Sequence, residues 1–422
     1  MKESVRSLLQ TAFSDAISQS VRDAKLRLRK DVAKWHAGRV FIVGWGKSSD
    51  VFIEDLLKSV PRRRLAGCAY LSLKKSKVSG KVWRFHATHP VITSQNINGS
   101  KRIVKMLSDS CKDDLVVIIS SGGGSAMFEV LDSKVSLAKA QECIRSLLRK
   151  DVDIRIINYI RKACSLVKGG RLIPLIGSDN VLVYVVSDIV LPGGPSVAYR
   201  HVASGPTMGE GLSETQRREI RSSIRRSGAL RFIPESVLLE RADNCSPRRG
   251  QRVRHSLLCD NSAVQDHLAK SLEKKGFVVK KRKTAYMGES SKVAEMLMSE
   301  FRRELRKTRK RPLAYICGGE STVEVKRGGK GGRLQDLAAR VIEPLSKIKT
   351  SHFFGFASDG QDFIPGVGGV YVNSRTYGWC RKELQKRILE SNTYSLHKRL
   401  GSHLRPGKAV LNVSDILVFL EE

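Results

Sequence analysis

The chain alternates short apolar runs with longer amphipathic stretches, which predicts buried strands separated by helices. Each run has four to six uncharged residues, and the clearest are Val40–Val43, Leu115–Ile119, Val181–Val186, Leu313–Cys317, Phe353–Phe356 and Leu417–Leu420. The stretches between them have helical spacing, as in the stripe Val293, Leu297, Phe301 and Leu305. Continuous apolar runs are typical of parallel strands covered on both faces. The pattern therefore predicts an α/β fold with mostly parallel sheets covered by helices.

Domain organisation follows from the length and from one weakly patterned segment. At 422 residues the chain exceeds what a single hydrophobic core usually serves, so two domains are expected. Residues 207–252 are rich in Gly, Glu, Arg and Ser and contain Pro234 and Pro247. We place the boundary there, with a Rossmann-like three-layer α/β domain over 1–240 and a second α/β domain over 241–422.

Polar and glycine residues gather where the predicted strands end. Most apolar runs are followed at once by such residues, namely Gly44–Lys47, Ser120–Ser125, Ser187-Asp188, Gly318–Glu320 and Ser358–Gly360. In open α/β sheets, ligands bind outside the carboxyl ends of the strands. The sequence therefore predicts a ligand site at these strand ends.

The most distinctive of these ends is the loop Ser121-Gly122-Gly123-Gly124-Ser125. Consecutive glycines cost conformational entropy and pack no side chain, so a purely structural turn explains them poorly. Backbone N–H groups freed of side chains can approach an anion, and the dipole of a following helix favours negative charge. We interpret the loop as an anion cradle, with a structural turn as the alternative.

A lysine follows the first predicted strand in Gly44-Trp45-Gly46-Lys47. The segment is not a Walker A loop, because Phe41 stands where that motif needs its first glycine. A lysine at a helix start can neutralise a phosphate or a developing oxyanion. Lys47 is therefore a candidate catalytic residue, and the alternative is an ordinary surface lysine.

The second half of the chain carries two further glycine-rich segments. Gly319 and Glu320 end one predicted strand, and Gly331-Gly332-Arg333 follows soon after it. Both segments could bring backbone close to an anion, and the guanidinium of Arg333 can fork onto a phosphate or a carboxylate. Arg333 and these glycines are therefore candidate ligands for an anion.

Two aspartates are candidate ligands for Mg²⁺. Asp188 and Asp359 each follow a predicted strand. Carboxylates bind magnesium directly or through water, and Asp359 could instead accept a proton from a substrate hydroxyl. The structural alternatives are a helix cap for Asp188 and an Asp-Gly turn for Asp359.

The formal net charge of +35 comes in runs, such as Arg217–Arg226 and Arg302–Arg311. A basic field attracts nucleic acid, acidic membranes or small anions. Most runs lie on predicted helices, where they are typical of solvated faces, and none is interleaved with the aromatic residues of a base-stacking platform. Nucleic-acid binding is therefore the least favoured class of function.

Other global features exclude several classes of protein. The eight cysteines show no zinc-ligand spacing, and no apolar run approaches the ~20 residues of a membrane span. The first segment has helical spacing and contains Glu3 and Asp15, whereas transit peptides are poor in acidic residues. We expect a cytoplasmic protein that does not bind membranes, with a mitochondrial location as the alternative.

Taken in order, the motifs resemble those of the glycerate 2-kinase family, and animal glycerate kinases look most similar. The resemblance runs nearly from end to end. It rests on Val43-Gly44-x-Gly46-Lys47, His89-Pro90, Ser121–Ala126, Asn158-x-x-Arg161-Lys162, Lys168-Gly169-Gly170-Arg171, Ser187-Asp188, Ala203–Thr207, Gly318-Gly319-Glu320-x-Thr322, Gly329-x-Gly331-Gly332-Arg333-x-Gln335, Asp359–Asp362 and Asn412-Val413-x-Asp415.

The resemblance implies a reaction and its participants. Members transfer the γ-phosphoryl group of ATP to the 2-hydroxyl of D-glycerate with a divalent metal, here Mg²⁺, and release 2-phosphoglycerate. It implies an active site between the two domains, a MOFRL region over about 313–422, and a monomer or homodimer. Small-molecule substrate and nucleotide are thus the expected partners.

The resemblance also assigns roles to residues. Lys47 and Arg333 would stabilise the transferring phosphoryl group. Asp188 and Asp359 would serve the metal or activate the hydroxyl, and which does which stays open. The residues expected to bind substrate or phosphate are Ser121, Gly122, Gly123, Gly124, Ser125, Lys168, Gly319, Glu320, Gly331 and Gly332.

Several loops depart from the family pattern. The family continues Ser-Asp-Val with Gly-Asp, whereas Ile189–Gly194 lacks that second acid. Its Gly-Thr-Asp-Gly run reads Ala357–Gly360, and its terminal Thr-Gly-Thr-Asn reads Ala409–Asn412. Each hydrogen bond made only in the transition state is worth ~10²–10³ in rate. The alternative function is therefore a weakened or inactive kinase that binds a small anion or a partner.

Overall fold

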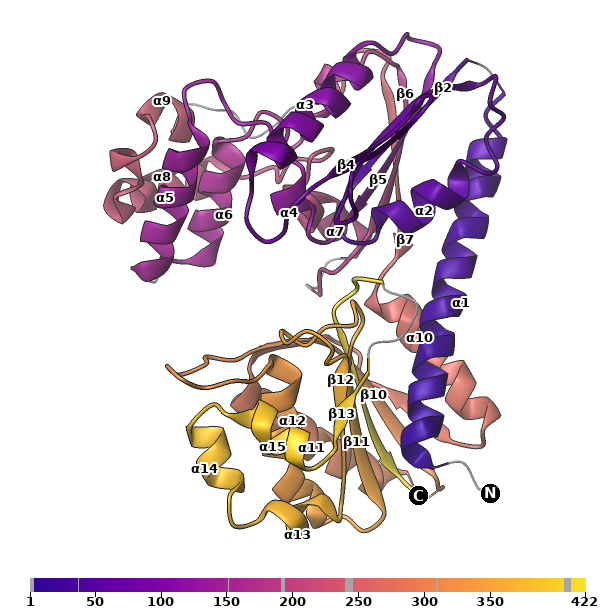
Figure 1. Cartoon of the computed structure of the whole chain (residues 1–422), viewed down its shortest axis with the longest axis vertical. Helices are drawn as coiled ribbons and strands as arrows, with labels where there is room; N and C mark the ends of the chain where they lie inside the picture. Colours follow the sequence, from indigo (N-terminus) through magenta and orange to yellow (C-terminus); the bar gives the residue numbers. More distant parts are fainter. Residues whose placement is uncertain are drawn as a thin grey trace. The chain divides into compact units, whose positions relative to one another are not determined.

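A computed structural model describes residues 4–36, 38–150, 152–190, 194–239, 246–308, 310–405 and 411–422 (Figure 1). The chain forms two compact units. The N-terminal unit comprises Lys25–Ser187 and Gly193–Leu258, and the C-terminal unit comprises Met1–Ala24, Asp188–Pro192 and Cys259–Glu422. The domain boundary expected between residues 240 and 241 falls in segment 240–245, outside the described residues, and stays a prediction.

The sheet of the N-terminal unit has the strand order β3-β4-β2-β1-β5-β6-β7. Its strands are β1 (Val40–Trp45), β2 (Leu65–Ser72), β3 (Lys77–Ser79), β4 (Val82–His86), β5 (Leu115–Ser121), β6 (Asn180–Val186) and β7 (Arg252–Cys259). β1 pairs in parallel with both β2 and β5, and β5 pairs in parallel with β6. Because Trp45 lies opposite Ser120, the loops after β1 and β5 leave the sheet at the same edge.

Helices pack against both sides of this sheet, with α3 and α2 on opposite faces (Figure 1). The helices of the unit beyond α1 are α2 (Ser49–Leu56), α3 (Ser94–Ser108), α4 (Gly124–Met127), α5 (Leu137–Arg149), α6 (Ile154–Ala163), α7 (Pro195–His201), α8 (Glu214–Ser227) and α9 (Glu235–Leu238). The last residues of α1 (Val5–Ala33) also belong to it. Cys143, Ile160 and Ile224 belong to a separate apolar core formed by α5, α6, α8 and α9.

The C-terminal unit contains a mixed sheet, ordered β13-β12-β11-β14-β10-β8, with β9 also paired to β10. Its strands are β8 (Val278–Lys281), β9 (Tyr286–Glu289), β10 (Leu313–Thr322), β11 (Ser351–Ala357), β12 (Gly369–Asn373), β13 (His403–Leu404) and β14 (Asp415–Glu421). The α/β class is confirmed, but the expectation of a mostly parallel sheet is wrong here. β14 runs antiparallel to both β10 and β11, since it enters between them from the opposite edge of the sheet.

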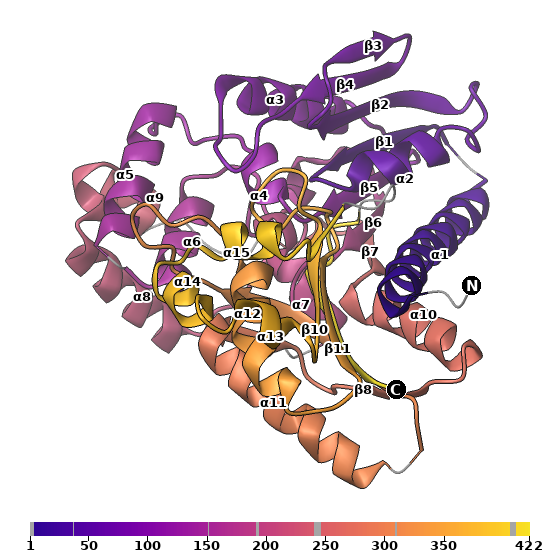
Figure 2. The same cartoon turned by 60° about the horizontal axis from the view of Figure 1, so that its bottom comes forward.

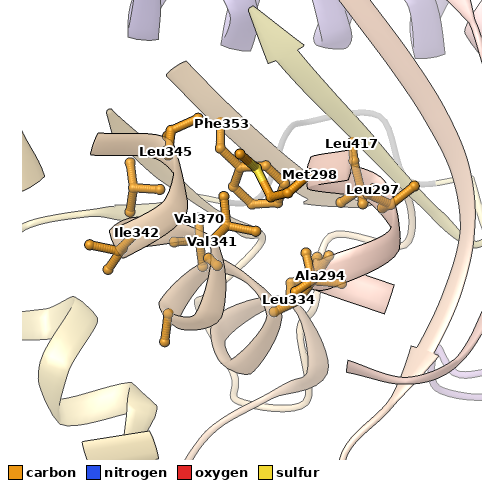
Figure 3. Close-up of a cluster of buried hydrophobic side chains, with 14 of the residues drawn as sticks. Ala294, Leu297, Met298, Leu334, Val341, Ile342, Leu345, Phe353, Val370 and Leu417 are labelled. Atoms are coloured by element: carbon orange, nitrogen blue, oxygen red, sulfur yellow. The ribbon is translucent and has the colours of Figure 1, made fainter. Parts of the chain in front are cut away.

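The core of this unit lies between its sheet and helices α11 and α12 (Figure 2). The helices are α10 (Asn261–Lys274), α11 (Ser290–Lys307), α12 (Arg333–Ser346), α13 (Thr376–Cys380), α14 (Leu384–Leu389) and α15 (Thr393–Arg399), together with the first part of α1. Leu297, Val341 and Phe353 meet in the core, as Figure 3 shows. The predicted stripe on α11 is confirmed, because Val293, Leu297 and Phe301 are buried.

Within the described ranges, none of the helices combines the length and apolarity that crossing a bilayer requires.

Candidate functional site

The N-terminal unit brings together the two glycine loops that follow β1 and β5. The N–H of Lys47 donates to the carbonyl of Gly122 at 2.9 Å, and the N–H of Ser48 donates to Oγ of Ser121 at 3.0 Å. Gly46 has φ +105°, and a Cβ there would overlap Ser121. The glycine at 46 is therefore required for the close approach of the two loops.

The side chain of Lys47 lies over the glycine loop. Gly123 has φ +83°, and a Cβ on it would lie 2.9 Å from Cγ of Lys47 and 3.3 Å from Cδ2 of His89. A Cβ on Gly124 would lie 2.6 Å from Cβ of Ala203. Gly123 and Gly124 are thus closely packed against neighbouring residues, and the binding of an anion by the loop stays a prediction. The helix after it, α4, has only four residues, so its dipole adds less than a longer helix would.

Lys168 occupies a different position from the one expected of a phosphate ligand. Its side chain is 1% exposed, and its ammonium donates to the carbonyl of Ser125 at 2.8 Å while it pairs with Glu129. Oγ of Ser125 lies 2.9 Å from Oγ of Ser204. Lys168 therefore supports the glycine loop from within the protein, and the charge of its ammonium is balanced by Glu129.

Asn96 is a supporting residue that the sequence did not indicate. Its Oδ1 accepts hydrogen bonds from the N–H and hydroxyl of Thr88, at 3.1 and 2.9 Å, and its Nδ2 donates to the carbonyl of Ala126 at 2.9 Å. These bonds attach the segment that carries His89 to α4. Asn96 lies in a helix that is far from the glycine loop in sequence, and nothing in the sequence indicated its role. The nearest residues in the chain that belong to a family motif are His89 and Pro90.

In the C-terminal unit, Arg333 stands at the first position of α12 and is held by two acids. Its Nε and Nη2 donate to the two carboxylate oxygens of Asp415 at 2.6 and 2.8 Å. Its Nη1 lies 3.1 Å from Oε1 of Glu320. Asp415 belongs to the motif Asn412-Val413-x-Asp415, but the sequence did not indicate that it lies at the site; its position directly before the last apolar run is the one local signal.

Burial and neighbouring charges set the protonation of this arginine cluster, defined as Arg333, Asp415, Glu320 and Asp362. Burial raises the pKa of Asp415 to about 7; the ion pair with Arg333 opposes the rise, and Glu320 and Asp362 add to it. Burial tends to lower the pKa of Arg333, but Asp415 and Glu320 outweigh this and keep that pKa above its ordinary value. The guanidinium therefore stays charged.

The acids of the segment Ser358–Asp362 separate into two roles. Asp362 is fully buried and accepts the N–H groups of Leu334 and Gln335 at 3.1 and 3.0 Å, which caps α12. Burial raises the pKa of Asp362. Oδ1 of Asp359 accepts the N–H of Gln361 at 3.1 Å, the contact expected of an Asp-Gly turn. Asp362 is thus structural, while the half-buried Asp359 stays a candidate.

Packing accounts for the glycines predicted to bind phosphate in this unit. A Cβ on Gly332 would overlap the carboxylate of Asp362, and one on Gly331 would overlap the hydroxyl of Thr393. A Cβ on Gly319 would overlap Tyr286. These glycines are needed for the fold whether or not an anion binds there.

Asp188 joins the C-terminal unit and lies close to the arginine cluster. Its Oδ2 accepts Nδ2 of Asn412 at 3.0 Å, and its carbonyl accepts the hydroxyl of Ser414 at 2.6 Å. Oγ of Ser414 also lies 3.3 Å from Oε2 of Glu320. The structure thus brings Asp188, Glu320 and Arg333 into one neighbourhood. The departures at 191–193 and 409–410 lie outside the described residues.

No group of three or more His, Cys, Asp or Glu side chains in the described part of the chain is arranged to hold a metal ion by itself. Asp188 and Glu320 nevertheless supply the oxygen ligands that Mg²⁺ prefers, and Mg²⁺ commonly binds through one or two carboxylates together with water and substrate phosphates. These residues therefore fit an ion that arrives with a nucleotide.

The chain is similar to known proteins over most of its length. Residues 3–239 match the family described as "Domain of unknown function (DUF4147)", and residues 313–415 match the MOFRL family. A glycerate 2-kinase of Pyrococcus horikoshii is 28% identical over 399 residues, which cover 90% of this chain and 87% of that protein. A glycerate kinase of Mus musculus is 25% identical, with 94% and 85% of the two chains covered.

A solved structure shares the fold. The crystal structure of a glycerate kinase from Thermotoga maritima superposes with a TM-score of 0.82 at 22% identity, covering 98% of this chain and 99% of that one.

Proposed function

The chain belongs to the DUF4147 family and carries a MOFRL region, and on that premise we propose that it is a glycerate 2-kinase. The reaction would transfer the γ-phosphoryl group of ATP to the 2-hydroxyl of D-glycerate and release 2-phosphoglycerate and ADP. A relative named glycerate 2-kinase and another named glycerate kinase match 90% and 94% of this chain. We further propose a cytoplasmic enzyme that acts as a monomer or homodimer.

The observation that carries the proposal is the fixed guanidinium of Arg333. Phosphoryl transfer needs positive charge around the equatorial oxygens of the transferred group, held in place before the reaction begins. Asp415 and Glu320 orient Arg333 at the start of α12, and the side chain is 28% exposed. An arginine oriented in this way can meet a phosphoryl group with little loss of conformational entropy.

The glycine loop and Lys47 would bind the other charged groups. Backbone N–H groups of the loop can approach the carboxylate of glycerate or a phosphate, because no side chain projects from Gly122, Gly123 or Gly124. Lys47 lies over Gly123 and would neutralise charge at the same place. Lys168 would act as a positioning residue, since it holds the carbonyl of Ser125.

The acids would serve the hydroxyl group and the metal. Asp188 with Glu320, or Asp359, would hold Mg²⁺, which when bound neutralises charge on the phosphates of ATP. The remaining carboxylate would accept the proton of the 2-hydroxyl as it attacks. We leave open which of the two aspartates, Asp188 or Asp359, takes each of these tasks.

A coupled assay of ADP release with D-glycerate, ATP and Mg²⁺ tests the proposal. We expect release that depends on glycerate, and ³¹P NMR should identify 2-phosphoglycerate rather than 3-phosphoglycerate as the product. No glycerate-dependent release at high enzyme concentration would refute kinase activity.

The second candidate function is an inactive kinase that binds a small anion or a partner. It is favoured by the missing second acid after Asp188. Calorimetric titrations with ATP and with glycerate separate the two candidates. Binding of either ligand without turnover supports this second one.

A further inference from the structure

A cavity of about 580 Å³ opens on the helical side of the C-terminal unit, between α11, α12 and α14. Its volume lies within the ~300–1,000 Å³ typical of small-molecule sites. On α12, the first residue that lines the cavity is Ala339, which lies about two helical turns beyond Arg333. The cavity is therefore separate from the arginine cluster.

Two arginines project into this cavity from one face of α11. Arg302 and Arg306 are one helical turn apart, so their positive charges repel each other. An anion bound between them would offset this repulsion. Nη2 of Arg302 donates to the carbonyl of Pro344 at 3.2 Å, which orients the guanidinium without neutralising it. Across the described ranges, neither arginine forms an ion pair. Guanidinium groups that form no ion pair on one wall favour an oxyanion ligand.

A third arginine reaches the cavity from α12 and is already oriented. Nε of Arg340 donates to Oδ2 of Asp336 at 2.7 Å, and the hydroxyl of Ser290 donates to the same oxygen. Asp336 is buried, so this anchor is firm. Arg340 lines the cavity, and a guanidinium has four further N–H donors beyond the one at Nε.

The rest of the lining limits the kind of anion that fits. Met298 and Leu384 are buried apolar side chains that form part of the wall. Glu295 and Glu343 also line the cavity, and their carboxylates disfavour ligands with several negative charges. The lining therefore suits one oxyanion group on an apolar body rather than a polyphosphate.

We propose that this cavity is a second ligand site, which takes a small organic molecule with one phosphate or carboxylate group and an apolar body. The oxyanion lies against Arg302, Arg306 and Arg340, and the body contacts Met298 and Leu384. The site goes beyond the proposed kinase activity and does not depend on it.

Phenyl phosphate and benzoate are suitable probes, because each joins one oxyanion group to an apolar ring. Calorimetry on the 422-residue chain should show saturable binding of one of them at millimolar concentration or below, and inorganic phosphate and phenol should bind more weakly. With methionine methyl groups labelled by ¹³C, the resonance of Met298, assigned with Met298→Leu, should shift on binding. The probe that shifts it more identifies the anion.

Variants of α11 test the role of the arginines. Arg302→Gln with Arg306→Gln should weaken binding at least about tenfold, because two charge-assisted contacts are lost. Arg303→Gln with Lys307→Gln removes the same charge from exposed positions on the same helix outside the cavity and should leave binding unchanged. Ser299→Phe should abolish binding by filling the cavity without removing charge.

Two results would overturn the proposal. One is an unshifted Met298 resonance with both probes at saturating millimolar concentration. The other is equal weakening in the two double variants, which would mean general attraction to a basic helix. Because these measurements use neither ATP nor glycerate, they succeed or fail independently of the kinase assay.

Discussion

The glycine loop of the N-terminal unit and the arginine cluster of the C-terminal unit would bind anions by different means. The loop uses backbone: Lys47 N–H and Gly122 carbonyl join two strand ends, and Gly123 has room for no side chain. The cluster uses buried charge, since Arg333 shares two hydrogen bonds with the fully buried carboxylate of Asp415. Backbone loops are sensitive to added atoms, whereas a buried charge network is sensitive to unbalanced charge.

The largest expected effect is that of Arg333→Gln. Loss of a guanidinium that stabilises the transition state should lower kcat by about 10²–10³. Removal of one partner from a buried ion pair should also cost about 3–5 kcal/mol of stability. The coupled assay and urea unfolding measure the two losses separately.

The double variant Arg333→Gln with Asp415→Asn is the control for this prediction. It removes both charges, so most of the stability should return while kcat stays low. Recovery of activity together with stability would show that the arginine is structural only. The arginine cluster would then not be an anion site to compare with the glycine loop.

Lys168→Met tests how far the glycine loop depends on a buried charge. The substitution leaves the carboxylate of Glu129 buried without its cation, which should cost about 3–5 kcal/mol in unfolding free energy. Adding Glu129→Gln should recover much of that loss. A kcat that stays low in a double variant of normal stability would support the positioning role, and an unchanged kcat would argue against it.

Gly123→Ala tests the backbone side of the comparison. The added Cβ would meet Lys47 in a left-handed conformation, which should cost about 1–2 kcal/mol and lower kcat/KM by displacing the lysine. Gly80→Ala is a matched control, since Gly80 also has positive φ (+56°) but no atom near the position of a Cβ. Equal activity losses in both variants would contradict a special role for the loop.

The most gradual expected effect is a dependence of stability on pH. The folded pKa of Asp415, about 7, lies above its unfolded value of ~3.9, so the folded state binds more protons between these values. The stabilising contribution of this carboxyl is full below about pH 4 and is lost as the pH rises through 7, at no more than ~1.4 kcal/mol per pH unit. Urea unfolding at pH 5 and pH 8 should show the decline, and Asp415→Asn should reduce it; an equal decline in the variant would assign it to other groups.

Much of the fold could be predicted from the sequence because buried strands have a local signature. The runs at Val40–Val43 and Leu115–Ile119 became neighbouring parallel strands, and the Val293 stripe became the buried face of α11. The order of strands in the second sheet could not be predicted, since an apolar run such as Leu417–Leu420 has no mark of strand direction. Its antiparallel pairing depends on where the chain re-enters the sheet.

For the candidate site, too, the sequence predicted the local features but not the contacts between distant segments. Glycine and charge at strand ends indicated the loops of Lys47, Gly123 and Arg333, because the chemistry of those residues is local. What the sequence alone determined is thus the class of fold and the kinds of group available at the strand ends. Only the tertiary structure decided which charges are balanced: it paired Lys168 with Glu129 and Arg333 with Asp415. Those pairings depend on burial and on contacts between distant segments, which no local pattern specifies.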